Sequence, residues 1–412
     1  MGFLSLIRRG RSKEKLAVVF DVSSGSVGGA LISLAPGENP KIFYTTRLAL
    51  PVKEAIDSKR FIEETFRALD LVAEDIRKHG FPHARFAILG GIPSASVFFF
   101  LASPWHVSQV RVLKKNEEEP FTVRREMVQE LAEHEIEMFK KSQAAEYERR
   151  GMKKEELSIL EQNIFDIRLN RYAVDDPFGK VGQEFTMTTY MSVAPQYIVD
   201  SLRDRAERFF GAHDAHIHSF MFAFFNIARD IWHAEDTFLL VDVSREVTDI
   251  GIVRDGRLFD MLSFPLGYGA LFRDVARELK TSIEEAQSLV RLAIKKQISE
   301  SQMSRVGEVL SASGKTWKDA FEAEVRNLYR KIPFSHRIML TTHNVLSYWF
   351  KDLIESKEDG KGFLKETTFE VALLNSAVLS DFYRFKGRIE EDPFLAIETI
   401  FISKDKDIVS SR

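Results

Sequence analysis

Short apolar runs that end in an acidic residue are the clearest feature of the hydrophobic pattern. Residues 16–21 (LAVVFD) form the first run and residues 237–242 (TFLLVD) form the second. A continuous apolar run of this length, followed by a turn, is typical of a buried β-strand. In each case a turn of small or polar residues leads into another apolar stretch, at residues 30–34 and 250–253. The repeat of this strand–turn–strand unit predicts two related α/β halves that face each other across a cleft.

The remaining pattern predicts the elements that complete the two halves. Apolar residues three and four positions apart predict helices at residues 61–78, 195–210, 221–232, 270–280, 283–296 and 345–355. Strand-like segments lie at residues 41–50, 86–89, 164–193 and 337–340. Residues 110–163 are densely charged, and the stretches RREMVQELAEHEIEMFKK and EYERRGMKKEEL within them predict solvated helices.

Composition narrows the possible classes of protein. A chain of 412 residues is too long for one core, so we expect about two to four domains. The net charge of -3 gives no electrostatic reason to expect a nucleic acid partner. The absence of cysteine excludes disulfides, thiolate metal sites and cysteine nucleophiles, and it fits a cytoplasmic location. No segment reaches the roughly 18 apolar residues that a membrane-spanning helix needs.

The first fifteen residues, MGFLSLIRRGRSKEK, have a composition of their own. An apolar helical face is followed by basic residues, and its members are Phe3, Leu4, Leu6, Ile7, Arg8 and Arg9. Such a segment could lie weakly on an anionic membrane surface, with the apolar face in the lipid and the cations at the headgroups. The alternative is a solvated tail, as many N-termini are.

The turns after the two acidic strand ends have the chemistry of phosphate binding. Small residues let backbone N–H groups approach phosphate oxygens, and an acid at a strand end can hold Mg²⁺ through water. The candidate nucleotide-binding residues of the two turns are Asp21, Ser23, Ser24, Gly25, Ser26, Asp242, Ser244, Thr248 and Asp249. His213, His216 and His218 lack a carboxylate or cysteine to complete a ligand set, so no metal site is predicted there.

Both turns resemble the phosphate loops of actin-like ATPases, in particular the FtsA and PilM group. FDVSSGSVGGALI at residues 20–32 resembles the first loop, and LLVDVSREVTDIGIVRDGRL at residues 239–258 resembles the second. Three more segments resemble parts of the family. Residues 263–291, which include Gly267, resemble its glycine turn and the two helices that follow. Residues 337–354 resemble its adenosine loop, and residues 392–401 resemble its closing helix.

The resemblance implies an α/β, actin-like two-lobe fold, in which two duplicated ribonuclease-H-like lobes carry an inserted small α+β domain. An N-terminal segment at residues 1–15 would precede the first lobe at residues 16–88 and 191–236. The inserted domain would occupy residues 89–190. The second lobe would occupy residues 237–412, with an upper subdomain at about 268–335.

The sequence departs from the family in four parts of the nucleotide site. The lysine that often follows the first loop is absent at residues 27–29, and Ser244, Arg245 and Glu246 replace the glycines of the second loop. Residues 341–344 (TTHN) replace the adenosine-loop glycines, and residues 286–290 (AQSLV) replace an Ala-Glu-x-x-Lys motif that faces the adenine. These changes imply that ATP binding is weak or absent. Asp21 and Asp242 would hold Mg²⁺ through water only if nucleotide binds.

The resemblance implies a protein that works by presenting surfaces. The expected function is that of a non-catalytic or weakly nucleotide-binding FtsA-like scaffold, which links a cytoplasmic cell-division assembly to the inner membrane. One alternative is a PilM-like cytoplasmic adaptor of a type IV pilus machine, and another is an active ATPase with divergent loops. Partners would be cytoplasmic or inner-membrane assembly proteins at the inner face of the membrane, with possible self-association and weak contact with the membrane surface.

Overall fold

The computed structural model describes most of the chain. The described residues are 14–53, 57–85, 95–149, 155–343, 345–356, 368–386 and 391–404. The strand predicted at residues 86–89 and the candidate membrane residues from Phe3 to Arg9 lie outside these ranges. None of the helices within them has the length and apolar character that a bilayer span requires.

The first sheet contains six strands in the order β15–β3–β2–β1–β4–β9. Their bounds are β1 (Lys15–Val22), β2 (Ser26–Leu34), β3 (Lys41–Ala49), β4 (Ser96–Leu101), β9 (Ala215–Ser219) and β15 (Arg384–Phe385). Strands β1 to β3 run antiparallel, whereas β4 and β9 continue the sheet parallel to β1. Strand β1 is apolar from Leu16 to Phe20 because both of its faces are buried. Val19 packs into one core cluster and Val18 into another.

The second sheet repeats this arrangement in five strands, in the order β12–β11–β10–β13–β14. Their bounds are β10 (Thr237–Val243), β11 (Thr248–Arg254), β12 (Arg257–Phe264), β13 (Arg337–Thr342) and β14 (Glu370–Leu373). Three antiparallel strands are again followed by two parallel ones. Asp21 and Asp242 each occupy the position before the last of the first strand. The predicted repeat of a strand–turn–strand unit is therefore confirmed.

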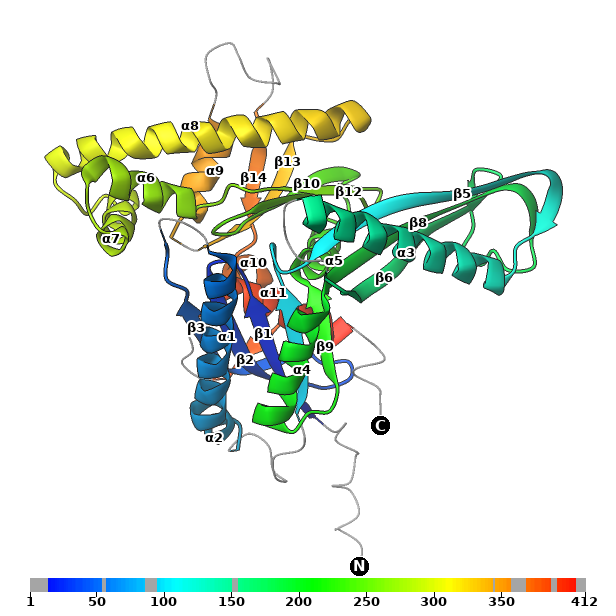
Figure 1. Cartoon of the computed structure of the whole chain (residues 1–412), viewed down its shortest axis with the longest axis horizontal. Helices are drawn as coiled ribbons and strands as arrows, with labels where there is room; N and C mark the ends of the chain where they lie inside the picture. The colour runs from blue at the N-terminus through cyan, green and yellow to red at the C-terminus, as the bar shows by residue number, and fades with distance from the viewer. Residues whose placement is uncertain are drawn as a thin grey trace, which may run out of the picture.

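Helices cover the outer face of each sheet (Figure 1). On the first sheet, α1 (Ser58–Asp75) and α4 (Gln196–Phe210) share a core with the strands, and α1 continues through a π-helical turn (Ile76–Gly80) into α2 (Phe81–Arg85). The second sheet carries α6 (Gly269–Leu279), α7 (Ile283–Ile294), α8 (Glu300–Lys331) and α9 (Ser347–Glu355). The pattern did not predict α8. Its start is marked by a capping box, in which Ser299 and Gln302 bond to each other's backbone N–H.

Two strongly apolar helices pack into a core that is shared by both sheets. These helices are α5 (Phe220–Ile231) and α11 (Pro393–Lys404), and their residues cluster with side chains from β1 and β10. A helix that is apolar all round is stable only when it is enclosed, and this core encloses both. The expectation that residues 237–412 belong wholly to the second lobe is corrected here. After the short α10 (Ser376–Leu379), β15 joins the first sheet and α11 packs on β1.

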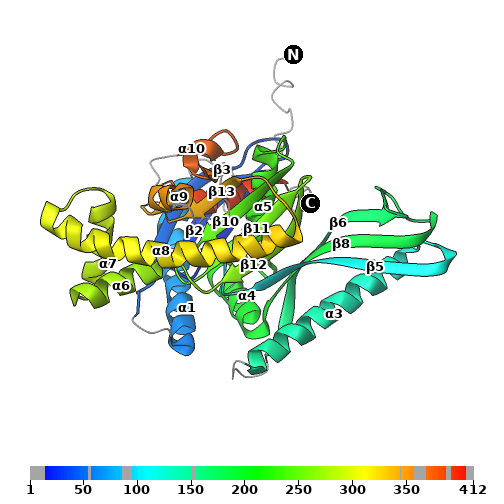
Figure 2. The ribbon, with the colours of Figure 1, turned by 90° about the horizontal axis from the view of Figure 1, so that it is seen from above.

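A third sheet with one covering helix projects from the side of the molecule (Figures 1 and 2). It has the strand order β5–β8–β6–β7, with β5 (Val107–Thr122), β6 (Leu157–Leu169), β7 (Tyr172–Ala173) and β8 (Val181–Pro195). Helix α3 (Arg125–Arg149) packs Val128 and Ala132 against Phe185 and Met187 of β8.

The third sheet bears on two expectations, one about the charged segment and one about the bounds of the inserted domain. The helix over RREMVQELAEHEIEMFKK is confirmed, and residues 146–149 of the second stretch extend the same helix. Residues 150–154 of that stretch lie outside the described ranges, and its last residue, Leu157, begins β6. The charged residues before the helix, for which no element was predicted, form β5. Charged side chains on β5 are compatible with a strand because β5 is an edge strand, and charges protect an edge from further pairing. Strand β4 also lies within the range expected for the inserted domain, yet it pairs with β1, so the third sheet begins at Val107.

Candidate functional site

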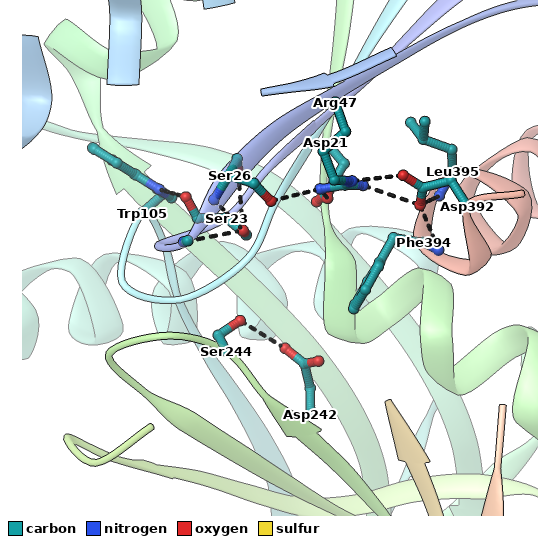
Figure 3. A network of polar contacts seen from close by, with 11 residues as sticks. Asp21, Ser23, Ser26, Arg47, Trp105, Asp242, Ser244, Asp392, Phe394 and Leu395 are labelled. Carbon is teal, nitrogen blue, oxygen red and sulfur yellow. Dashed lines mark hydrogen bonds and ion pairs between the residues drawn. The ribbon is translucent and has the colours of Figure 1, made fainter. Parts of the chain in front are cut away.

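A cleft of about 340 Å³ lies where the strand ends of the two sheets meet. Asp21, Ser23, Gly25 and Ser26 of the first hairpin line it, and so do Asp242 and Ser244 of the second. In Figure 3 the two hairpins face each other across this space, with Asp21 on one side and Asp242 on the other. The cleft is near the lower end of the volume range for small-molecule sites, roughly 300–1,000 Å³.

Two backbone N–H groups of the first hairpin are hydrogen-bonded to a side chain of the same hairpin. The Ser23 hydroxyl accepts hydrogen bonds from the N–H groups of Gly25, at 3.3 Å, and Ser26, at 3.2 Å. It also donates to the Ser26 carbonyl at 3.1 Å. Ser24 is fully buried, and its hydroxyl accepts from the Glu246 N–H at 3.1 Å. The N–H groups of Gly25 and Ser26 are thus already bonded within the hairpin.

Arg47 on β3 is the functional residue that the sequence analysis missed. The strand register aligns Asp21 with Gly28 and Gly28 with Arg47, so the three residues form one row across three strands. A Cβ atom at Gly28 would lie 2.5 Å from Arg47 Nη2, so glycine leaves the space that the guanidinium crosses. Arg47 then donates to Asp21 at 2.7 Å and to the Ser26 hydroxyl at 2.8 Å (Figure 3).

The other edge of the guanidinium is bound by Asp392. Arg47 donates to the two carboxylate oxygens of Asp392 at 2.5 and 3.1 Å. Asp392 also accepts from the N–H groups of Phe394 and Leu395, and so it caps the start of α11. Burial by itself would lower the pKa of Arg47, but the charges of Asp392 and Asp21 raise it above its usual value. Arg47 is therefore a fixed cation between two acids from opposite ends of the chain.

Asp21 has a second buried acid beside it. Glu398 of α11 is fully buried, and burial followed by the charge of Asp21 raises its pKa well above the usual value. Burial also raises the pKa of Asp21, although Arg47 opposes this effect. Burial therefore favours the neutral form of both acids, and at Asp21 the ion-paired Arg47 opposes this effect.

Asp242 of the second hairpin is bonded to hydroxyl groups, and among the described residues no cation forms an ion pair with it. Thr341 donates to it at 2.8 Å and Ser244 at 3.1 Å. Burial and then the charge of Asp249 raise the pKa of Asp242 to about 8. Asp242 is therefore mostly protonated at neutral pH.

Arg245 and Glu246, which replace the family's glycines, are both paired within the protein, although Arg245 also lines the cleft. Arg245 is buried, and its guanidinium donates to the Leu50 carbonyl at 2.9 Å and the Pro51 carbonyl at 3.3 Å. Glu246 accepts from Arg245 at 3.0 Å and from Arg273 of α6 at 2.8 and 3.2 Å. Both charges at this tip are thus used within the protein.

Three further candidate residues support the site without lining the cleft. Thr248 donates to the Leu266 carbonyl and accepts from Trp317 at 3.0 Å. Asp249 accepts from Ser103 at 2.9 Å and from Ser263, and burial raises its pKa to about 6. Gly267 lies against the second hairpin, where a Cβ atom would come within 2.1 Å of the Ser244 carbonyl oxygen.

Polar side chains from α7 and from the segment that resembles the adenosine loop form the upper wall of the cleft. Tyr268, Gln287, Arg291 and His343 line it. Burial, together with the charges of Arg291 and Arg47, lowers the pKa of His343 to about 4. Gln287 lies in the segment that replaces the adenine-facing motif, so its position in the wall agrees with the resemblance. In the described part of the chain, no group of three or more histidines and acids could hold a metal ion.

The comparisons with known proteins identify the fold. No protein-family model matches the chain, and no curated protein is similar to it in sequence. A solved structure of the PilM–PilN type IV pilus biogenesis complex is similar over 96% of this chain and 96% of that chain, at 12% identity and a TM-score of 0.53.

Two further solved structures match less closely. The ethanolamine utilization protein EutJ from Carboxydothermus hydrogenoformans covers 94% of this chain and 88% of its own, at 11% identity and a TM-score of 0.40. An MreB of Spiroplasma citri bound to AMPPNP covers 96% and 97%, at 9% identity and a TM-score of 0.39. The chain has the actin-like ATPase fold, with similarity to PilM along nearly its whole length.

Proposed function

We propose that this protein is a PilM-like cytoplasmic adaptor of a type IV pilus-type machine, which works by binding partner proteins and not by turning over ATP. The observation that carries the proposal is the Arg47 ion pair. Arg47 contacts Asp21 at 2.7 Å and Asp392 at 2.5 Å, in the part of the cleft where the family resemblance implies phosphate and Mg²⁺.

A bound nucleotide would have to break these contacts. Removing one partner of a buried ion pair typically costs about 3–5 kcal/mol, because the other charge is left without compensation. The N–H groups of Gly25 and Ser26, which a phosphate would need, are bonded to Ser23. The residues of the first hairpin therefore do not fit a triphosphate in this arrangement.

Binding of Mg²⁺ at the second hairpin would carry an added cost. A carboxyl group must be deprotonated to bind a metal, and the pKa of Asp242 is about 8. The Glu246 carboxylate adds a negative charge next to the tip, although Arg245 and Arg273 neutralise it. This supports a scaffold with a vestigial cleft over an active ATPase with divergent loops.

The choice of a pilus role over a division role depends on similarity of fold. The PilM–PilN complex has this fold over nearly the full chain. By this likeness the partner is the cytoplasmic tail of an inner-membrane protein of the PilN kind, which would place the adaptor at the inner face of the membrane. The FtsA-like role in cell division stays a prediction from sequence.

Calorimetric titration with ATP and Mg²⁺ tests the loss of nucleotide binding. We expect no heat of binding at millimolar ATP, and no phosphate release above the uncatalysed background. A dissociation constant in the low micromolar range that disappears in Asp242→Ala would overturn the scaffold proposal. Titration with a peptide of the PilN-type cytoplasmic tail tests the adaptor role separately, and absence of binding at high peptide concentration would contradict it.

Weak membrane contact by residues 1–12 is a further proposal. The apolar face from Phe3 to Ile7 is short, so Arg8 and Arg9 must contribute, and binding to anionic vesicles should fall with added salt. Vesicle co-sedimentation of the chain with and without residues 1–12 measures this. Equal co-sedimentation of the two forms would contradict a membrane role for the segment.

A further inference from the structure

We propose that the tip of the second hairpin, residues 244–247, is an intramolecular clasp that joins the two sheets and fixes the width of the cleft without a ligand. Hairpins that clamp a nucleotide are bridged by that ligand. Here the side chains that replaced the glycines bridge the two hairpins directly. The residues that mark the loss of the phosphate site thereby acquire a different role.

The main contact of the clasp is made by Arg245. Its guanidinium donates to the carbonyl oxygens of Leu50 at 2.9 Å and Pro51 at 3.3 Å, in the segment that follows β3 of the first sheet. The side chain is only 4% exposed. Burial lowers the pKa of Arg245, and the neighbouring Glu246 opposes that effect. A buried cation held by carbonyl groups of the opposite sheet ties the two together through hydrogen bonds of the stronger, charge-assisted kind.

Glu246 makes the second contact between the hairpins. Its backbone N–H donates to the Ser24 hydroxyl of the first hairpin at 3.1 Å. Its carboxylate is held by Arg273 of α6, so the tip is fixed to its own sheet as well. Leu50 completes the link, since its N–H donates to the Gly25 carbonyl at 2.9 Å. The carbonyl that Arg245 binds thus belongs to a residue that is itself bonded to the first hairpin.

The turn between β12 and α6 contacts the backbone of the clasp and supports it. The N–H of Tyr268 donates to the Ser244 carbonyl at 3.1 Å, and the N–H of Gly269 donates to the Arg245 carbonyl at 2.8 Å. A Cβ atom at Gly269 would lie 2.8 Å from Arg245 Cγ, so this glycine is needed for the approach. The first hairpin packs on the same assembly, because a Cβ atom at Gly25 would lie 2.2 Å from the Tyr268 hydroxyl.

The clasp does not depend on the pilus role, and it would hold the two hairpins together whatever partner the protein binds. Its test is hydrogen–deuterium exchange of the full chain, read by mass spectrometry, for the wild type, Arg245→Ala and Arg254→Ala. Arg254 is a matched control because it lies at the other end of β11 and is exposed.

We expect peptides that cover residues 23–26 and 48–52 to exchange about tenfold faster in Arg245→Ala, since loss of a hydrogen bond to a charged group changes a local equilibrium by that order. Peptides from β8 in the third sheet should exchange as in the wild type, and Arg254→Ala should leave both regions unchanged.

Unchanged exchange at residues 48–52 in Arg245→Ala would overturn the proposal. A rise that includes β8 to the same extent would also overturn it, because Arg245 would then contribute only to global stability. If Arg245→Ala does not fold, Arg245→Lys serves instead. Lysine keeps the charge but lacks the fork of donors, so a smaller rise confined to the same two peptides is expected, and a wild-type pattern would count against the clasp.

Discussion

In each sheet, three residues that are aligned across neighbouring strands form a row beside the cleft, and the two rows contain different charged residues. In the first sheet the register aligns Asp21, Gly28 and Arg47, whereas in the second it aligns Asp242, Asp249 and Ser263. The first row brings a cation to its aspartate, and the second row places another acid beside it. Burial raises the pKa of both aspartates, but Arg47 opposes this effect at Asp21, whereas the charge of Asp249 adds to it and raises the pKa of Asp242 to about 8. Equivalent positions in a repeated fold thus have different electrostatic surroundings, because the neighbouring strands supply different partners.

The largest effect should come from breaking the first row. Arg47→Met leaves Asp21 and Asp392 in the protein interior without their shared cation. We expect a loss of about 3–5 kcal/mol in the free energy of unfolding, measured by urea denaturation. Arg291→Ala is the control, because Arg291 lines the same cleft but is exposed, and it should change stability by less than about 0.5 kcal/mol. Equal losses in the two variants would remove the distinction between the rows.

A smaller effect should come from adding a side chain at Gly267, where the turn before α6 packs against the second hairpin. In Gly267→Ala the added Cβ atom would meet the Ser244 carbonyl oxygen at 2.1 Å and the Arg245 carbonyl oxygen at 2.5 Å. Backbone cannot yield as a flexible side chain does, so we expect a loss of about 2–3 kcal/mol. Gly307→Ala in α8 is the matched control, since its Cβ would meet nothing within 4 Å, and helix propensity predicts a gain of up to about 1 kcal/mol. Thermal unfolding of both variants measures the contrast, and a stable Gly267→Ala protein would contradict the packing described here.

The smallest effect is a pH dependence that belongs to the second row. The pKa of Asp242 is higher in the folded protein, at about 8, than the usual value of 3.8. Between these values the unfolded chain has lost the proton and the folded protein keeps it, so stability from this group is full at low pH and falls as pH rises towards 8. Asp242→Asn removes the group that titrates. We expect it to be more stable than the wild type by about 1 kcal/mol or more at pH 8, with the difference shrinking towards pH 4.

Denaturation curves at several pH values measure this prediction. Asp249→Asn is a useful comparison, because the pKa of Asp249 is about 6. The contribution of Asp249 to the free energy of unfolding should therefore be lost at lower pH than that of Asp242. A constant difference between Asp242→Asn and the wild type from pH 4 to pH 8 would show that Asp242 is ionised throughout, and the contrast between the rows would fail.

The sequence predicted the repeated strand–turn–strand units because the signal is local. A run such as residues 16–21 is apolar because two cores enclose β1, and the acid at its end is the point where the strand meets the cleft. The same local reasoning assigned no element to residues 110–122, which form most of β5, because their dense charge gives no apolar pattern. It also assigned no strand to the histidines at 216 and 218, which lie in β9 and stack on Phe98 and Phe100.

The candidate site was predicted less fully than the fold. The two hairpins and their aspartates could be located, but Arg47 could not, because its contact with Asp21 depends on the register of three strands and on the missing side chain of Gly28. The direction of the Arg245 side chain could not be predicted for a similar reason, since only the packing of a distant segment at Leu50 and Pro51 decides where its guanidinium points. Asp392 lies 345 positions from Arg47 in the sequence, and no local pattern connects them.

The position of α11 also constrains the order of events during synthesis. Residues 393–404 fill part of the core that β1 and α5 share, and Asp392 supplies one of the acids bound to Arg47. The first sheet is translated early, yet this part of its core stays open until the ribosome has passed α11. At about 5–20 residues per second, that interval is on the order of tens of seconds to more than a minute. Within that interval the Phe-rich surface of α5 would be exposed from its own synthesis to that of α11, which is roughly 170 residues later or about 10–35 s. This exposure makes the nascent chain a natural client for a chaperone.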